Sequence, residues 1–238
     1  MIADNIVTSK YNENGTYLRG VHSFVSRNRK LSGSKYNFLN KYWPKFGVNF
    51  QSTYLKINNI FYANSPIVLE IGFGMGESLS NTALKNLSKN FLGIEVYLPG
   101  IISCLKHIRA YRLKNVRIIY HDAVEVLTSM IYDKSMSKIQ MFFPDPWPKR
   151  RHCKRRIFTK NFAKLIFRKL VHNGILHIST DCQSYAEEIV SIVRSLNTCN
   201  NLFNRNDYNV GYNFRPITKF ERRGMDLGHT IFDLIFKV

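Results

Sequence analysis

The residues best suited to chemistry lie in one segment, 142–149, which reads FFPDPWPK. An apolar run at 139–143 leads into it, and two prolines then flank a single carboxylate, Asp145, and restrict its backbone. The aromatic ring of Trp147 follows, and six lysine and arginine residues fall within 149–156. A carboxylate at a strand end, a flat stacking surface and a block of positive charge together indicate an enzyme that acts on a base within a nucleic acid.

The composition agrees with an anionic partner. The chain has 238 residues, a formal net charge of +19 and an isoelectric point near 9.9. Its natural partner is therefore a polyanion such as RNA, DNA or an acidic membrane. A nucleotide-biased genome would also raise the lysine content, but it does not explain six cations in eight residues. The length and the 45% hydrophobic content suit one α/β domain with a small extension.

The cysteines and histidines indicate no metal site. The four cysteines are scattered without a C-x-x-C pair, and we interpret all of them as reduced thiols. The N-terminus lacks the apolar run of a signal peptide, and no stretch approaches the roughly 18 apolar residues of a spanning helix. We expect a cytoplasmic protein without a metal, a membrane association or an obligate protein partner.

The chain divides into two parts. Residues 1–45 are polar and basic, and we predict a partly flexible arm with one docked segment near 42–44, the alternative being a tail with no role. Residues 46–238 are predicted to form the catalytic domain. Buried strands alternate there with helices, which indicates a mostly parallel sheet covered on both faces. We expect strands near 67–71, 91–96, 116–120, 139–143, 175–179 and 231–236, with Gly174 stopping the helix before the fifth.

A glycine loop follows the first expected strand. It reads Glu70-Ile-Gly72-Phe-Gly74-Met-Gly76-Glu77, and glycines let a ligand approach the backbone closely. A dinucleotide fingerprint would place its third glycine where Glu77 stands, and that carboxylate would repel a pyrophosphate at the helix N-terminus. The spacing instead suits a cofactor without phosphates and with a positive centre, such as S-adenosylmethionine. A glycine turn needed only for packing is the alternative.

Two further acids stand at successive strand ends. Glu95 ends the second expected strand, where a carboxylate can accept both ribose hydroxyls. Asp122 follows the third, where it can accept from an adenine amino group. Either one alone is more often a solvated surface acid. Together with Glu70 they indicate a cofactor site at the carboxyl edge of the sheet.

These motifs resemble those of the bacterial tRNA (guanine-N7)-methyltransferases of the TrmB type. The matches include 21–29, 42–47, 69–76, 93–95, 143–156, 179–181 and 218–222. The Pro-Asp-Pro-Trp core and the Thr-Lys-Phe-Glu segment are specific to that family, whereas the glycine loop is shared more widely. The resemblance implies a class I S-adenosylmethionine-dependent fold, Rossmann-like, with a mostly parallel seven-stranded sheet and helices on both faces. It also implies methyl transfer to N7 of the guanine at position 46, in the tRNA variable loop.

The resemblance also assigns residues. It implies a catalytic role for Asp145. Cofactor contacts are expected at Glu70, Gly72, Gly74, Gly76, Glu95, Asp122 and Asp145. Substrate and RNA contacts are expected at Lys149, Arg151, Lys154, Arg155, Arg156, Asp181, Thr218, Lys219, Phe220 and Glu221, the last four on a late loop.

The chemistry of N7 limits what these residues need to do. N7 carries a free lone pair, so catalysis can depend on positioning and electrostatics without prior deprotonation. Asp145 would stabilise the positive charge that methylation leaves on the purine, rather than act as an obligatory base; a turn carboxylate that caps an N–H is the alternative. Trp147 either stacks on the base or is structural, and either Glu221 or Asp181 reads the guanine edge.

Two other functions remain open at this stage. One is methylation of another RNA or of a small molecule. The other is a non-catalytic RNA-binding protein, against which the intact loop at 70–76 argues.

Overall fold

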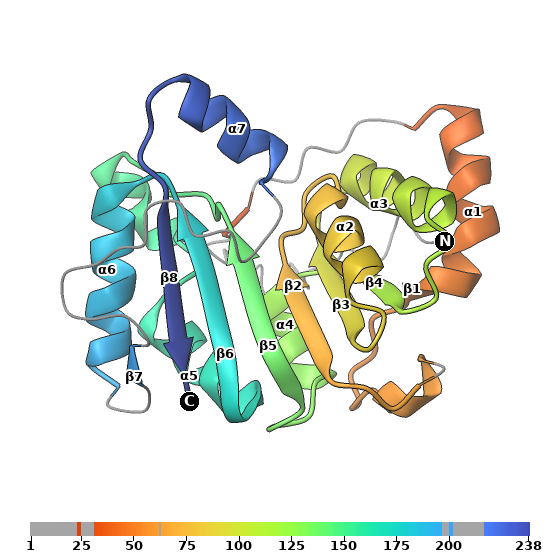
Figure 1. Ribbon diagram of the computed structural model, residues 1–238, viewed down its shortest axis with the longest axis horizontal. Helices are drawn as coiled ribbons and strands as arrows, with labels where there is room; N and C mark the ends of the chain where they lie inside the picture. Colours follow the sequence, from red (N-terminus) through yellow and green to blue (C-terminus); the bar gives the residue numbers. More distant parts are fainter. Residues whose placement is uncertain (1–22, 25–30, 62, 197–199, 202–216) are drawn as a thin grey trace, which may run out of the picture.

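The computed structural model describes residues 23–24, 31–61, 63–196, 200–201 and 217–238. One mixed sheet runs through this part of the chain in the order β1-β4-β3-β2-β5-β6-β8-β7, and β8 pairs antiparallel with both β6 and β7 while the remaining pairs are parallel (Figure 1). The strands are β1 (Gly47–Val48), β2 (Ile67–Ile71), β3 (Asn90–Glu95), β4 (Val116–Tyr120), β5 (Met136–Phe142), β6 (Leu170–Thr180), β7 (Asn200–Asn201) and β8 (Phe232–Lys237).

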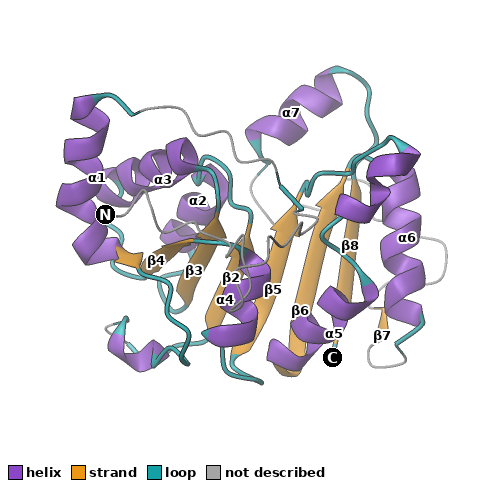
Figure 2. Ribbon diagram, turned by 180° about the vertical axis from the view of Figure 1, so that it is seen from behind, coloured by secondary structure: helices purple, strands orange, loops and turns teal. Residues whose placement is uncertain are grey.

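Helices cover both faces of the sheet, as predicted (Figure 2). On one face α1, α2 and α3 bury their apolar sides against β3 and β4, and on the other α4, α5 and α6 pack over β2, β5 and β6. A seventh helix, α7, lies above the carboxyl ends of the parallel strands (Figure 1). The helices are α1 (Gly33–Phe46), α2 (Glu77–Lys85), α3 (Leu98–Ala110), α4 (Ala123–Ser129), α5 (Lys160–Lys169), α6 (Gln183–Arg194) and α7 (Lys219–Asp226).

The strand order reverses between β2 and β5. From β2 the chain adds β3 and β4 on one side, and then crosses to add β5 and β6 on the other. In open α/β sheets such a reversal leaves a crevice outside the carboxyl ends of the strands, where ligands bind. The glycine loop after β2 and the Pro-Asp-Pro-Trp turn after β5 face each other across this point.

Two details differ from the sequence prediction. The described sheet has eight strands where the resemblance implied seven: the six strands expected from the residue pattern are joined by the two-residue strands β1 and β7, one at each edge. Gly174 was expected to stop a helix, which is wrong: α5 ends at Lys169 and Gly174 lies inside β6. The backbone carbonyl of Gly174 accepts a hydrogen bond from Val238 N at 3.1 Å. This residue therefore takes part in the backbone pairing of β6 with the end of the chain that follows β8.

Helix α1 docks the end of the N-terminal segment onto the domain. Its buried side chains are Leu39, Trp43 and Phe46, and they join the core formed with α3. The indole Nε1 of Trp43 donates to Asn49 Oδ1 at 2.8 Å. The predicted boundary between residues 45 and 46 falls within α1, and the division into an arm and a catalytic domain stays a prediction.

Candidate active site

A cavity of about 700 Å³ opens at the carboxyl edge of the sheet. The ends of β2, β3, β4 and β5 supply its walls, and Ser23 and Phe24 of the N-terminal segment also line it. The cavity brings together Gly72, Glu95, Asp122 and Asp145, which come from four separate parts of the chain.

The glycine loop has the backbone that its sequence predicts. Gly72, Gly74 and Gly76 have φ angles of 71°, 56° and 78°, a left-handed region in which other residues are strained. A side chain at Gly72 or Gly74 would meet no atom within 4 Å, so this backbone borders open space. At Gly76 a Cβ atom would lie 2.4 Å from Cys104 Cβ, because α3 packs directly against the loop.

Glu95 holds the loop from the end of β3. Its Oε2 accepts from Gly74 N at 2.8 Å, and its Oε1 accepts from Val96 N at 2.6 Å and Tyr97 N at 2.9 Å. Burial raises the pKa of Glu95 above its usual range, although the three N–H donors partly offset this and the nearby Asp145 charge adds to it. The residue therefore lies at the predicted place and also fixes the loop.

The other strand-end acids have distinct surroundings. Glu70 is 2% exposed, and its Oε2 accepts from Gln140 Nε2 at 2.7 Å across the β2–β5 pair. Asp122 caps α4: its Oδ1 accepts from Val124 N at 2.8 Å and Glu125 N at 3.1 Å. Among the described residues its Oδ2 has no hydrogen-bond partner, which leaves that oxygen for a ligand.

His121, beside Asp122, is a cavity residue that the sequence reasoning did not assign. It is 2% exposed, its ring stacks on Phe50 with centroids 3.8 Å apart, and its Nε2 lies 2.5 Å from Glu125 Oε2. These contacts fix the wall of the cavity next to Asp122. Histidine after a buried strand is the only local signal, and it does not identify such a role.

The turn after β5 is strained and braced. Phe143 and Trp147 have φ angles of 52° and 43°, in a region that bulky residues rarely occupy. Phe143 N donates to Ser179 O at 2.7 Å, which ties the turn to β6. Asp145, between the two strained residues, is exposed at the rim of the cavity.

Trp147 is half-buried, and part of its ring is already covered. The Arg155 guanidinium lies over the ring with its carbon 5.0 Å from the centroid, and His152 meets it edge-on at 6.0 Å. The indole Nε1 is buried without a hydrogen-bond partner among the described residues. These contacts give Trp147 a structural role.

The basic block forms a short 3₁₀ helix, η3 (Arg150–Arg155), beside the cavity. Lys149, Arg151 and Lys154 are exposed, and Arg155 is partly covered by its contact with Trp147. These four side chains lie where they can contact the phosphates of a nucleic acid bound at the cavity.

Arg156 differs from the other cations of the block. It is 7% exposed, its Nε donates to Pro146 O at 2.8 Å, and its Nη1 forms an ion pair with Glu188. Its guanidinium also lies over the Tyr185 ring, 4.8 Å from the centroid. The expectation that Arg156 is a phosphate ligand does not fit these partners, because its donors are directed into the protein.

The Thr218–Glu221 segment was expected on a loop, which is wrong: it begins helix α7. Thr218 Oγ1 accepts from Glu221 N at 3.0 Å and Glu221 Oε2 accepts from Thr218 N at 3.1 Å, a capping box. Lys219 and Phe220 belong to the first turn, and their side chains lie outside the described part. Asp181, after β6, lies 3.3 Å from His229 Nδ1, so the two candidate readers of guanine are each engaged within the protein.

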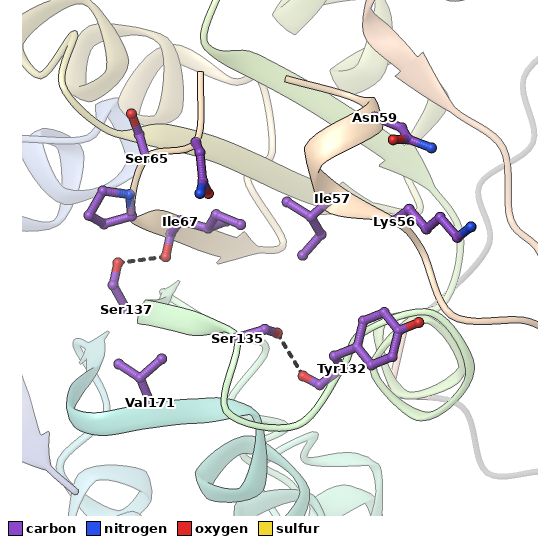
Figure 3. Close-up of a pocket in the computed structure, with 11 residues that line it drawn as sticks. Lys56, Ile57, Asn59, Ser65, Ile67, Tyr132, Ser135, Ser137 and Val171 are labelled. Atoms are coloured by element: carbon purple, nitrogen blue, oxygen red, sulfur yellow. Dashed lines mark hydrogen bonds between the residues drawn. The ribbon is translucent and has the colours of Figure 1, made fainter. Parts of the chain in front are cut away.

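A second cavity, of about 720 Å³, lies at the opposite, amino edge of the sheet (Figure 3). Two of the four hydroxyl groups in its described lining are engaged with backbone: Ser137 Oγ donates to Ile67 O at 2.7 Å and Ser135 Oγ to Tyr132 O at 2.6 Å (Figure 3). Lys56 is the one charged residue among its described lining. The first cavity is therefore the better candidate for catalysis.

The sheet order, the antiparallel β8 and the carboxyl-edge cavity define the Rossmann-like fold of class I methyltransferases. An aminoglycoside resistance methyltransferase of known structure has the same fold, with a TM-score of 0.52 at 11% identity over 79% of this chain and 95% of that one. The family model described as "Putative methyltransferase" matches residues 64–234, and the chain belongs to that family.

Bacterial relatives extend the match to nearly the whole chain. A tRNA (guanine-N(7)-)-methyltransferase of Buchnera aphidicola is 52% identical over 96% of this chain and 94% of its own. One of Photorhabdus laumondii is 44% identical over 98% of both chains. The resemblance inferred from the motifs is thereby confirmed.

Among the described residues, no helix is long and apolar enough to cross a membrane.

Proposed function

We propose that the protein methylates N7 of the guanine at position 46 in the tRNA variable loop, with S-adenosylmethionine as methyl donor. The observation that carries the proposal is the single cavity at the β2–β5 reversal. It joins the glycine loop and two strand-end acids to the Pro-Asp-Pro-Trp turn, and η3 adds exposed cations at its rim. The names of the relatives at 44–52% identity support the same substrate.

The residues present fit this cofactor. Gly72 and Gly74 border open space, so a ligand can contact their backbone. Glu95 and Asp122 offer carboxylate oxygens for hydroxyl and amino groups, and Glu77 begins α2 where a pyrophosphate would otherwise bind. A cationic, phosphate-free molecule suits this acidic lining better than a dinucleotide does. When bound, S-adenosylmethionine would supply an electrophilic methyl group for the N7 lone pair to attack, and the electron pair of the breaking methyl–sulfur bond would remain on sulfur.

Asp145 is proposed as the catalytic residue. It lies at the rim of the cavity, on a turn held by Phe143 N and by the Arg156–Pro146 contact. A fixed carboxylate there stabilises the positive charge that forms on the purine ring, without reorganisation of solvent. N7 bears no proton, so Asp145 removes none.

The exposed cations of η3 are proposed to hold the tRNA backbone. Lys149, Arg151, Lys154 and Arg155 carry charge next to the turn, and phosphate contacts of this kind position a nucleic acid without reading its sequence. A tRNA substrate places the enzyme in the cytoplasm, and the proposal requires no metal and no partner protein.

The decisive experiment maps the modified base. The enzyme is incubated with unmodified tRNA and labelled cofactor, and the nucleosides are identified and located by mass spectrometry. N7-methylguanosine at position 46 supports the proposal. Label in another nucleoside or at another position, or in ribosomal RNA alone, would overturn it.

The role of Asp145 is tested separately. Asp145→Ala should lower kcat about 100-fold, the effect of removing one preorganised electrostatic partner, while the Kd for tRNA changes little. Glu187→Ala is the matched control, because Glu187 is exposed on α6 and pairs only with Gln183 Nε2 among the described residues. Equal kcat values for both variants would remove Asp145 from the mechanism.

A further inference from the structure

A third cavity, of about 660 Å³, lies between the C-terminal ends of α1 and α3 at the β1–β4 edge of the sheet. Its apolar floor is formed by Tyr42, Phe46, Ile108 and Leu113. Its charged lining is entirely basic among the described residues: Lys45, Arg109, Arg112, Lys114 and Arg117. We name these five cations the edge cluster.

Four members of the edge cluster are exposed, and no carboxylate pairs with any of the four in the described part of the chain. Positive charge at a helix C-terminus has an ordinary explanation, because each helix end carries roughly half a unit of negative charge. Lys45 and Arg109 lie in the last turns of α1 and α3 and compensate for these two ends. Arg112 and Lys114 follow α3, and their positive charges are not needed to compensate for either helix end.

Contacts within the cavity hold Arg109 and the backbone of the loop that carries Lys114. The Arg109 guanidinium lies over the Tyr42 ring with its carbon 5.5 Å from the centroid. Arg117 is buried, and its Nη1 donates to Lys114 O at 3.1 Å and Val116 O at 2.8 Å, which fixes the loop carrying Lys114. Fixed cations over an apolar floor bind an anion more strongly than freely solvated ones, because less entropy is lost and the local dielectric is lower.

We propose that the edge cluster is a second phosphate-binding site for the tRNA substrate, separate from η3. The inference rests on the proposed function. Helix α3 begins beside the glycine loop, spans 13 residues and has the cluster at its C-terminal end, and a helix of this length measures about 20 Å. A ligand that occupies the active site and this cluster together must therefore be a long polyanion, and a tRNA backbone meets that requirement. The cluster contacts phosphates remote from the target guanine.

The test compares two double variants that each remove one arginine and one lysine. Arg112→Gln with Lys114→Gln removes the surplus charges of the cluster. Lys164→Gln with Arg194→Gln is the control: both residues are exposed, and α5 and α6 lie on the far side of the sheet from α1 (Figure 1). None of these four side chains forms an ion pair among the described residues, so all variants should fold. Direct binding of unmodified tRNA is measured without cofactor between 0.05 and about 1 M salt.

Each phosphate contact contributes about 0.7–0.9 to the slope of log K against log salt, so losing two should reduce the slope by about 1.5. The electrostatic contribution of these contacts vanishes at about 1 M salt. A slope lower by about 1.5 therefore means that the cluster variant binds tRNA about 20-fold more weakly than the wild type at about 0.15 M salt. The control should lose less than about threefold, since charges beyond the Debye length are screened. Equal losses in the two double variants, or an unchanged slope in the first, would overturn the proposal.

Methylation by the wild-type enzyme separates this inference from the proposed function. If the wild type forms N7-methylguanosine and the cluster variant binds tRNA normally, the edge cluster has no role and the function stands. If the wild type binds tRNA through the cluster but methylates no guanine, the binding site stands and the proposed activity falls. For the cluster variant we expect kcat at saturating tRNA to equal that of the wild type.

Discussion

Arg156 provides the sharpest test of how the active-site turn is held. Its side chain joins the turn to α6: it donates to Pro146 O in the turn, pairs with Glu188 and lies over the Tyr185 ring, and the last two residues both belong to α6. Its position in the sequence groups it with the RNA-binding cations. In the structure it is instead a brace, by which we mean that its contacts hold the turn that carries Asp145. The two roles predict opposite responses to one conservative substitution.

The magnitude follows from the contacts that are lost. A hydrogen bond from a charged donor contributes about 1.5–3 kcal/mol, and a buried cation–π contact about 1–2 kcal/mol. The ion pair with Glu188, whose side chain is 40% exposed, adds less than about 1 kcal/mol because water screens it. Because such terms are not additive, we expect Arg156→Ala to lower the free energy of unfolding by about 3 kcal/mol.

Arg156→Lys distinguishes a brace from a phosphate ligand. Lysine keeps the charge but lacks the planar fork that reaches Pro146 O and Glu188 together. If Arg156 is a brace, the lysine variant binds tRNA with unchanged affinity and salt slope, yet kcat falls about 100-fold, the cost of a misplacement of about 1 Å. Urea unfolding, kcat at saturating tRNA and the Kd for tRNA are measured together.

Arg151 is the matched control, since it is exposed in the same block. Arg151→Ala should weaken tRNA binding and flatten its salt dependence, while the urea midpoint and kcat remain those of the wild type. The reasoning about Arg156 is wrong if Arg156→Lys retains full kcat while Arg156→Ala behaves like Arg151→Ala. Arg156 would then be the phosphate contact that the sequence suggested.

Three further predictions concern the loop, the cofactor site and stability. Gly76→Ala should abolish cofactor binding and lower the free energy of unfolding by more than about 3 kcal/mol, because the new Cβ adds a clash with Cys104 to the strain of a positive φ. Gly72→Ala meets no such clash and should cost only the strain, about 1–2 kcal/mol. Equal urea midpoints for the two variants would contradict this. Burial raises the pKa of Glu95 above 4.5, so S-adenosylhomocysteine affinity should fall as the pH drops through that raised pKa and the carboxylate is protonated, and calorimetry on Glu95→Gln should show weaker binding without that pH dependence. The hydrogen bond from buried Lys169 lowers the pKa of Asp133, so this pair stabilises the fold above the unfolded pKa of about 3.9 and the contribution is lost as pH falls through the lower folded pKa. Asp133→Asn should lower the free energy of unfolding by only about 1 kcal/mol at pH 7, because Asp133 is 47% exposed and water screens the pair, and urea titrations should show a smaller difference as the pH falls below the unfolded pKa.

The sequence predicts the cofactor side of the site well, because that side depends on local rules. Buried, mostly apolar strands of five or six residues end at a common edge, so Glu95 and Asp122 had to lie near one another. The positive φ angles of the loop could be anticipated from its glycines alone.

The substrate side was harder, because its residues are placed by contacts distant in sequence. Nothing near Arg156 shows that Glu188, 32 positions later, will take its guanidinium. The start of α7 is a different case: Thr218-x-x-Glu221 is a capping-box pattern, so a signal for the helix was present. The family motif drew attention to guanine recognition there, and the same two side chains serve first to begin a helix.

The turn after β5 shows why its motif depends on the rest of the fold. Phe143 and Trp147 each adopt a strained φ, at a cost of about 1–3 kcal/mol per residue. Such a backbone conformation persists only where several contacts with the surrounding structure hold it. Three contacts do so here: Ser179 O accepts from the start of the turn, Arg156 donates to its middle, and Arg155 covers its end. Two of these partners belong to the basic block. The cations that follow the carboxylate therefore divide their roles. Arg156 is directed inward and holds the turn that carries Asp145, Arg155 contacts Trp147 while remaining partly exposed, and the exposed Lys149, Arg151 and Lys154 are left for phosphate.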